Sequence, residues 1–169
     1  MILRKDVFVI LNFGSETEDY LKEVVKDSFP IYDLLSKPHL TLVHYPKINL
    51  KKLIRHTDEF MKTKQGLEIV LKINRLEYLT LETVVCFPDF SSELLKFYRD
   101  YTEKFKDKAE FYTTEDQWKP HITLYKGPAA QIIMNNLVEN FRPFKVRLKK
   151  IELSVNNKGN FEIVYSKEF

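Results

Sequence analysis

The sequence predicts an α+β fold of two similar lobes, each with a mostly antiparallel sheet and helices on its outer side. Three observations indicate it: strand-like and helix-like segments are interleaved, one strand–helix–hairpin unit occurs twice, and no linker or low-complexity stretch separates the copies. The 169 residues fit one domain, because domains usually contain about 100–200 residues. We therefore expect a single bilobal domain over residues 1–169, with a pseudo-two-fold axis between its lobes.

The first half of the chain alternates strands and helices. Apolar positions recur at helical spacing in residues 16–27, with Ser15 as the expected N-cap and Glu18 completing a capping box. Asn49 is the expected N-cap of a second helix. The expected elements are strand 6–13, helix 16–27, strand 39–45, helix 49–63 and strands 67–74 and 82–87.

The second half repeats this pattern after a long amphipathic helix. Asn156 to Gly159 form the expected turn between its last two strands. The expected elements are helix 91–107, strand 121–126, helix 129–140 and strands 144–155 and 160–166.

Composition excludes several classes of protein. Hydrophobic residues make up 44% and charged residues 30% of the chain, which is typical of a globular protein and argues against disorder. The net charge of +3, from 27 Lys and Arg against 24 Asp and Glu, is too small for nonspecific nucleic-acid coating but permits an anionic substrate in a basic cleft. The four glycines are scattered, which excludes the P-loop and the dinucleotide-binding fingerprint.

The short early apolar segment and the single cysteine favour an intracellular, reducing compartment. The longest early apolar run, residues 7–11, is too short for a signal peptide or a membrane span. Cys86 is the sole cysteine, so it forms no internal disulfide, and we expect it to be a buried apolar residue. We expect a cytoplasmic monomer with no membrane partner.

One hexapeptide occurs twice. Residues 37–42, KPHLTL, recur as residues 119–124, KPHITL, and His121 follows His39 by 82 positions. Each copy precedes a helix and then a pair of strands, so the two halves resemble copies of one unit. Two copies predict a pair of lobes, because a solenoid needs at least about three units.

The repeat places imidazoles and hydroxyls on one strand face. Residues i and i+2 of a strand share a face, so His39 points with Thr41. His121 points with Thr123 in the same way, and a pseudo-two-fold axis would bring both pairs into one cleft. One histidine could accept a proton from the attacking group and the other donate one to the leaving oxygen, while the hydroxyls stabilise the phosphate oxygens. This scheme requires no metal and no cofactor.

With these motifs the chain resembles the two-histidine (2H) phosphoesterases, which include RNA-ligase-like and cyclic nucleotide phosphodiesterase proteins. Their signature is His, an apolar residue, Thr or Ser and another apolar residue, present twice on a bilobal α+β fold. The resemblance implies a metal-independent phosphodiesterase for 2′,3′-cyclic phosphates or 2′,5′ linkages, acting on RNA ends, oligonucleotides or cyclic nucleotides. It makes His39 and His121 the acid/base pair, and Thr41 and Thr123 phosphate ligands.

Further substrate-binding residues follow the motifs. Tyr45 falls where the family often has an aromatic residue, and Lys126 falls where many members have arginine. Lysine lacks the bidentate fork of arginine, so the phosphate would be held differently or by another cation, for which Arg147 is the best substitute. We expect Tyr45 and Tyr125 on the same strand faces as the motifs, where either could stack on a base or bind a phosphate.

Two alternatives remain open. The fold could serve as a noncatalytic nucleotide- or RNA-binding module. A metal-dependent hydrolase ranks lower, because the chain has four histidines and no HExxH motif. We expect His44 on the opposite strand face from His39, His56 on the solvated side of its helix, and Trp118 either packed or stacked on a base.

Overall fold

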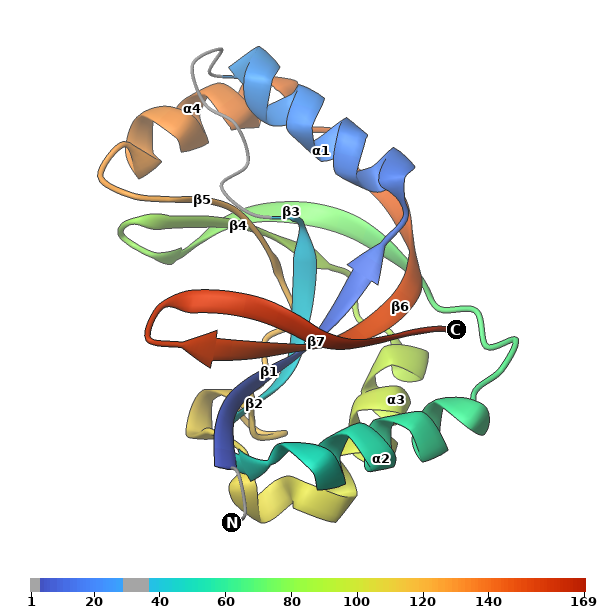
Figure 1. Cartoon of the computed structure of the whole chain (residues 1–169). Helices are drawn as coiled ribbons and strands as arrows, with labels where there is room; N and C mark the ends of the chain where they lie inside the picture. The colour runs from blue at the N-terminus through green and yellow to red at the C-terminus, as the bar shows by residue number, and fades with distance from the viewer. Residues whose placement is uncertain (1–3, 29–36) are drawn as a thin grey trace.

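The computed structural model describes residues 4–28 and 37–169, in which strands and helices alternate (Figure 1). The strands are β1 (Arg4–Phe13), β2 (His39–Asn49), β3 (Val70–Thr80), β4 (Thr83–Pro88), β5 (Ile122–Lys126), β6 (Phe144–Asn157) and β7 (Asn160–Glu168). The helices are α1 (Ser15–Ser28), α2 (Leu50–Lys62), α3 (Ser92–Thr102) and α4 (Ala130–Asn140), with short 3₁₀ helices η1 (Glu103–Lys108) and η2 (Phe111–Thr113). None of the described helices is long and apolar enough to cross a membrane.

The strands form one antiparallel sheet that closes on itself. They pair in the order β1-β2-β5-β4-β3-β6-β7, and β1 also pairs with β6, so β1 to β6 make a ring. Within the ring β1 lies between β2 and β6, just as β4 lies between β5 and β3. The expected α+β fold with a pseudo-two-fold arrangement is therefore confirmed. The contacts β2–β5 and β3–β6 join its two expected sheets into one.

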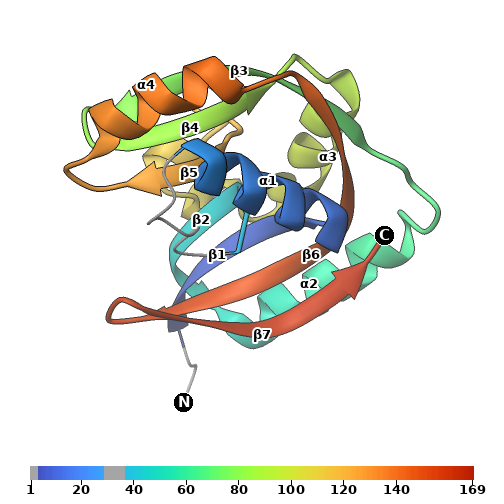
Figure 2. The same ribbon diagram turned by 90° about the horizontal axis from the view of Figure 1, so that it is seen from above.

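Helices cover the two halves from outside (Figures 1 and 2). α1 contacts α4, which packs on β4 and β5, whereas α2 packs on β1, β2 and β7. α3 lies beside α2, where the Phe60 and Phe97 rings are 5.2 Å apart. The strand faces beneath the helices are apolar, and Val7, Val9 and Leu11 of β1 are completely buried there. The opposite faces of the same strands are left to carry polar side chains.

Local sequence signals account for the helix starts. Asn49 caps α2 as expected, because its Oδ1 accepts a hydrogen bond from the Lys52 amide at 3.0 Å. α1 begins one residue earlier than expected, so Ser15 is its first residue and the carbonyl of Gly14 accepts the first amide bonds. The Glu18 carboxylate does not complete a capping box but pairs with Lys37 at 3.3 Å.

The end of α3 and the β6–β7 turn are two other boundaries. The helix expected over residues 91–107 ends at Thr102 and continues as the 3₁₀ helix η1, where the backbone of Phe105 is not helical (φ −129°, ψ 24°). The expected β6–β7 turn is present: Lys158 and Gly159 both have positive φ, 55° and 93°, which is the backbone of a type I′ hairpin.

Candidate active site

The pairing of β2 with β5 brings the two motifs together. Leu40 pairs with Ile122, and both side chains are completely buried toward the helices. In an antiparallel pair the flanking positions also lie opposite each other, which sets His39 beside Thr123 and Thr41 beside His121. All four polar side chains therefore share one sheet face. Directly opposed side chains have Cβ atoms about 4.5–5.5 Å apart, so the four form one compact group.

Both imidazoles are held by the same backbone contact. Nδ1 of His39 lies 2.9 Å from the Lys37 carbonyl, and Nδ1 of His121 lies 2.6 Å from the Lys119 carbonyl. A carbonyl oxygen only accepts, so each Nδ1 must carry the proton and donate. Each Nε2 is then left to accept a hydrogen bond in the neutral ring and to donate one in the charged ring.

The repeated Lys-Pro-His sequence explains this shared contact. The proline between the carbonyl and the histidine fixes φ near −65° and has no N–H of its own. It restricts the turn into the strand at Pro38 and again at Pro120. The motif thus sets the orientation of each ring as well as its position.

His121 has the more perturbed environment. Burial lowers its pKa most, the bond to the Lys119 carbonyl opposes that shift, and the nearby charge of His39 lowers the pKa further. The ring also meets Phe87 edge-on at a centroid distance of 5.9 Å. His121 is therefore favoured in its neutral form near pH 7, and the two imidazoles lie close enough for the charge of His39 to lower the pKa of His121.

A polar network beside His39 was missed by the sequence analysis. Asn12 pairs with His39 across β1 and β2, is completely buried, and donates through Nδ2 to Glu152 of β6. Glu152 also pairs with Lys150 at 2.6 Å, and this contact raises the pKa of Lys150. Asn12 Oδ1 has no partner among the described residues. The available signal was Asn12 inside the otherwise apolar residues 7–13, together with the charged Glu152 between Ile151 and Leu153.

Trp118 contacts the backbone of the strand that carries the first motif. Its indole N–H donates to the Thr41 carbonyl at 3.0 Å, and its ring stacks on Tyr98 at 4.2 Å. Of the two expectations for Trp118, this geometry favours packing, and it fixes the backbone beside His39 and Thr41.

Two β-bulges change the strand faces after the motifs. On β1, Val9 and Ile10 are consecutive, yet their partners are Val43 and Thr41, which makes Leu42 an extra residue. On β4, Val84 and Val85 pair with Tyr125 and Thr123, so Leu124 is the equivalent extra residue on β5. Each bulge moves the side chains that follow it to the opposite sheet face from the one that regular strand alternation predicts.

The bulges overturn the expectation for both tyrosines. Tyr45 is completely buried beneath the helices, with its ring edge-on to Phe105, and its hydroxyl has no partner among the described residues. Tyr125 is 5% exposed, and its hydroxyl accepts a hydrogen bond from the Ala129 amide at 3.2 Å. Neither ring lies on the face of the motifs. Lys126, in contrast, pairs with Thr83 on that face and is exposed.

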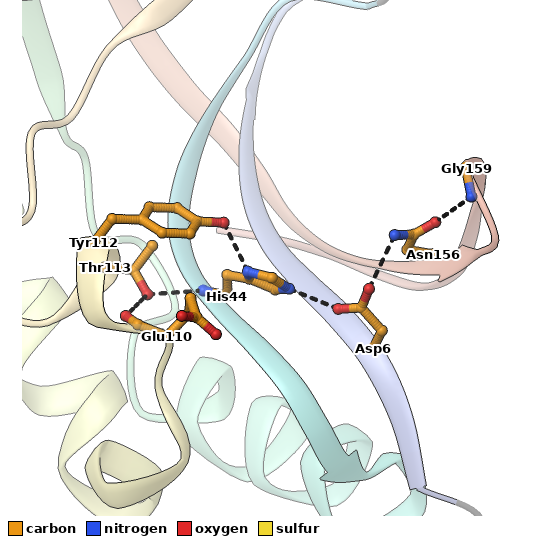
Figure 3. Close-up of polar contacts among 7 residues, drawn as sticks. All are labelled: Asp6, His44, Glu110, Tyr112, Thr113, Asn156 and Gly159. Atoms are coloured by element: carbon orange, nitrogen blue, oxygen red, sulfur yellow. Dashed lines mark hydrogen bonds and ion pairs between the residues drawn. The ribbon is translucent and has the colours of Figure 1, made fainter.

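The bulge at Leu42 also corrects the position of His44, which lies on the same face as His39. His44 pairs with Phe8 across β1 and stacks on its ring at 3.9 Å. Figure 3 shows His44 between two partners: Nε2 is 2.6 Å from Asp6 Oδ1, and Nδ1 is 2.6 Å from the Tyr112 hydroxyl. Both ring nitrogens are used, as in a satisfied structural histidine.

Two other residues can be compared with expectation, and one of them differs from it. His56 is 8% exposed and bonds the Tyr101 carbonyl at 2.8 Å, so the solvated position expected for it is wrong. Its pKa is lowered chiefly by burial. Cys86 is completely buried as expected, and burial raises its pKa to about 12.

Arg147 does not join the histidines. It pairs with Glu68 at 3.0 Å and lines a separate hollow at the start of α1, with Lys145 and Lys149. A different cation lies next to a neighbour of His121: the guanidinium of Arg75 is 5.5 Å from the centre of the Phe87 ring, which itself contacts His121. Within residues 4–28 and 37–169, no cluster of three or more His, Cys, Asp or Glu could hold a metal ion.

Comparison with solved structures identifies the fold. E. coli LigT in apo form is 12% identical, covers 98% of this chain and 97% of its own, and has a TM-score of 0.68. TT0787 of Thermus thermophilus is 15% identical over 96% of this chain and 97% of its own, with a TM-score of 0.67. A structure described as a phosphoesterase gives the same TM-score at 12% identity, over 97% of this chain and 98% of its own.

The chain therefore has the LigT-like fold of the two-histidine phosphoesterases, as its repeat predicts. No family model matches the sequence, and no curated protein matches it.

Proposed function

We propose that this chain is a metal-independent phosphodiesterase that acts on a 2′,3′-cyclic phosphate or a 2′,5′-type phosphodiester of RNA or a nucleotide. One observation carries the proposal: two imidazoles on one sheet face each donate through Nδ1 to a backbone carbonyl, which reserves both Nε2 atoms for substrate. A general acid and a general base are the groups that this hydrolysis needs.

The lowered pKa of His121 supports it as the general base. Its neutral Nε2 accepts a proton from water as the water oxygen attacks phosphorus. The bond between phosphorus and the ribose oxygen breaks, and protonated His39 donates its Nε2 proton to that oxygen. Thr41 and Thr123 donate hydrogen bonds to the non-bridging oxygens, where negative charge increases in the transition state.

The neighbours support this substrate class at the level of fold. E. coli LigT has been solved in complexes with phosphate and with 3′-AMP, at 12% identity to this chain. Lys126 and Lys150 lie on the motif face and are the cations we assign to the substrate phosphate, beside the four motif residues. Tyr45, Tyr125 and Arg147 are not part of this proposal.

The alternative is a nucleotide- or RNA-binding module on the same fold. E. coli LigT is also known in complexes with NADP⁺ and ATP, at 12% and 11% identity. Binding and catalysis would use the same sheet face, so the two hypotheses differ only in turnover.

Turnover in EDTA separates these hypotheses. The substrates are 2′,3′-cyclic mononucleotides, 2′,5′-oligoadenylate and cyclic dinucleotides, tested with wild type, His121→Ala and the matched control His56→Ala. We expect wild type and His56→Ala to hydrolyse one class, and His121→Ala to lose about 10²–10⁴-fold in kcat. Product binding without turnover in the wild type would favour the binding module, and activity that EDTA abolishes would favour a metal-dependent hydrolase.

A further inference from the structure

A hollow of about 460 Å³ adjoins the proposed general base. It lies between the end of β4, the start of α3 and the segment before β5. Phe87 belongs to both places, because it lines the hollow and contacts the His121 ring at 5.9 Å. Lys119 and Pro120 also line it, and the Lys119 carbonyl is the group that orients His121. Anything bound here therefore lies next to the imidazole proposed as the general base.

Aromatic rings form the apolar walls of the hollow. Phe87 and Trp118 are fixed by their contacts with His121 and Tyr98. Phe90 is 83% exposed and contributes nothing to the core, although it is a large apolar side chain. An exposed aromatic ring at the rim of such a hollow is suited to stacking on a flat ligand.

The polar groups of the hollow suit the edge of a base. Its lining carries three carboxylates, Glu77, Asp89 and Glu115, together with Arg75 and Lys119. The carboxylates pair with Arg75, Lys72 and Arg99 respectively, and their remaining oxygen lone pairs can accept hydrogen bonds from the ring N–H and amino groups of a base. Arg75 lies over Phe87 and pairs with Glu77 at 2.8 Å, which places a donor and an acceptor at the edge of the aromatic wall.

From this combination we infer that the hollow binds the nucleobase next to the scissile phosphate, with a preference for an amino-bearing purine. The volume falls within the range of about 300–1,000 Å³ found for small-molecule sites. The purine ring stacks on Phe90 and Phe87, and its polar edge faces Glu77 and Arg75. The inference rests on the proposed function and adds to it the part of the substrate that is recognised.

Binding tests this subsite without requiring turnover. Trp118 is the only tryptophan and lines the hollow, so its fluorescence reports occupancy directly. We expect AMP to quench it, ribose 5-phosphate not to, and Phe90→Ala to weaken AMP binding about tenfold, within the range for loss of one stacked base. Phe111→Ala is the matched control, because Phe111 is 69% exposed and lies outside the hollow. Absence of AMP quenching, or equal weakening in both variants, overturns the inference.

Turnover separates failure of the subsite from failure of the proposed function. The substrates are 2′,3′-cyclic AMP, 2′,3′-cyclic UMP and a base-free methyl riboside 2′,3′-cyclic phosphate. We expect Phe90→Ala to raise KM for the purine about tenfold, with kcat unchanged and the base-free substrate unaffected. Hydrolysis that does not depend on the nucleobase would contradict the subsite but not the phosphodiesterase activity. Quenching of Trp118 fluorescence by purines alone, without turnover of any substrate, would support the subsite and contradict the phosphodiesterase activity.

Discussion

His39 and His121 have the same backbone contact and different surroundings. Both donate through Nδ1 to a carbonyl, but His121 also lies against Phe87 and within the electrostatic influence of His39. This asymmetry would let two chemically identical side chains take the opposite roles proposed for them at one pH. The asymmetry arises from the burial of His121 and from its proximity to His39, and neither can be read from the sequence motif.

The first prediction is the acid limb of the pH profile. The proposed base must be neutral to act, and the pKa of His121 is lowered from 6.5 by burial. Activity should therefore persist as the pH falls to 6.5 and decline only below it, where His121 becomes protonated. The measurement is kcat/KM against pH for wild type. A limb whose midpoint lies above pH 6.5 would assign that step to another group.

The second prediction concerns Tyr45. Its hydroxyl is completely buried without a partner among the described residues, so Tyr45→Phe removes an unsatisfied polar group. We expect kcat/KM to be unchanged and the free energy of unfolding to stay equal or rise by about 1 kcal/mol. Tyr101→Phe is the contrast, because it removes a 2.8 Å hydrogen bond to Thr57. Reduced activity in Tyr45→Phe would return this residue to the site.

Within the strands, the alternation of side chains between the two sheet faces correctly predicted the faces of the motif residues. It failed for the residues just after each motif. His39 with Thr41, and His121 with Thr123, share a face because no irregularity interrupts either triplet. Leu42 and Leu124 then add one residue to each strand, and nothing in their side chains distinguishes a bulged leucine from a paired one. Tyr45, Tyr125 and His44 were misplaced for this single reason. Helix starts were more predictable, because a cap such as Asn49 acts locally.

The third prediction concerns the link between α2 and β7. Asp58 on α2 accepts hydrogen bonds from Tyr165 and Lys167 of β7 at 3.1 and 3.0 Å, and it pairs with Lys62 at 2.7 Å. These contacts, Lys62 first, hold its pKa far below 3.8. The stability they supply is present above pH 3.8 and is lost as the pH falls further toward the folded-state pKa.

Thermal unfolding from pH 7 to pH 2 measures this link. Asp58→Asn should lower Tm at pH 7 and flatten its decline below pH 4, because the titrating carboxylate is gone. Glu59→Gln is the control, since Glu59 makes only an exposed 3.9 Å pair with Arg55. Equal effects of the two substitutions would mean that Asp58 contributes no more than a surface charge.

At the scale of the whole molecule, the site depends on contacts between distant segments. The sequence repeat predicted two related halves, and the ring of strands has that relation. It could not predict that Asn12 would bond to Glu152, 140 residues away, or that Arg75 would lie over Phe87, the ring that contacts His121. Such neighbours are fixed by strand order, which depends on the packing of the complete fold.

We propose that the two motifs, 82 residues apart, operate as one catalytic unit. A double-mutant cycle in kcat tests it directly, with His39→Ala, His121→Ala and the double variant acting on the best substrate in EDTA. We predict that each single change costs about 10²–10⁴-fold. The double variant should lose little more than either single one, because groups that act as a unit are strongly non-additive. Losses that multiply, or full activity in either single variant, would show that the two histidines do not act as one catalytic unit.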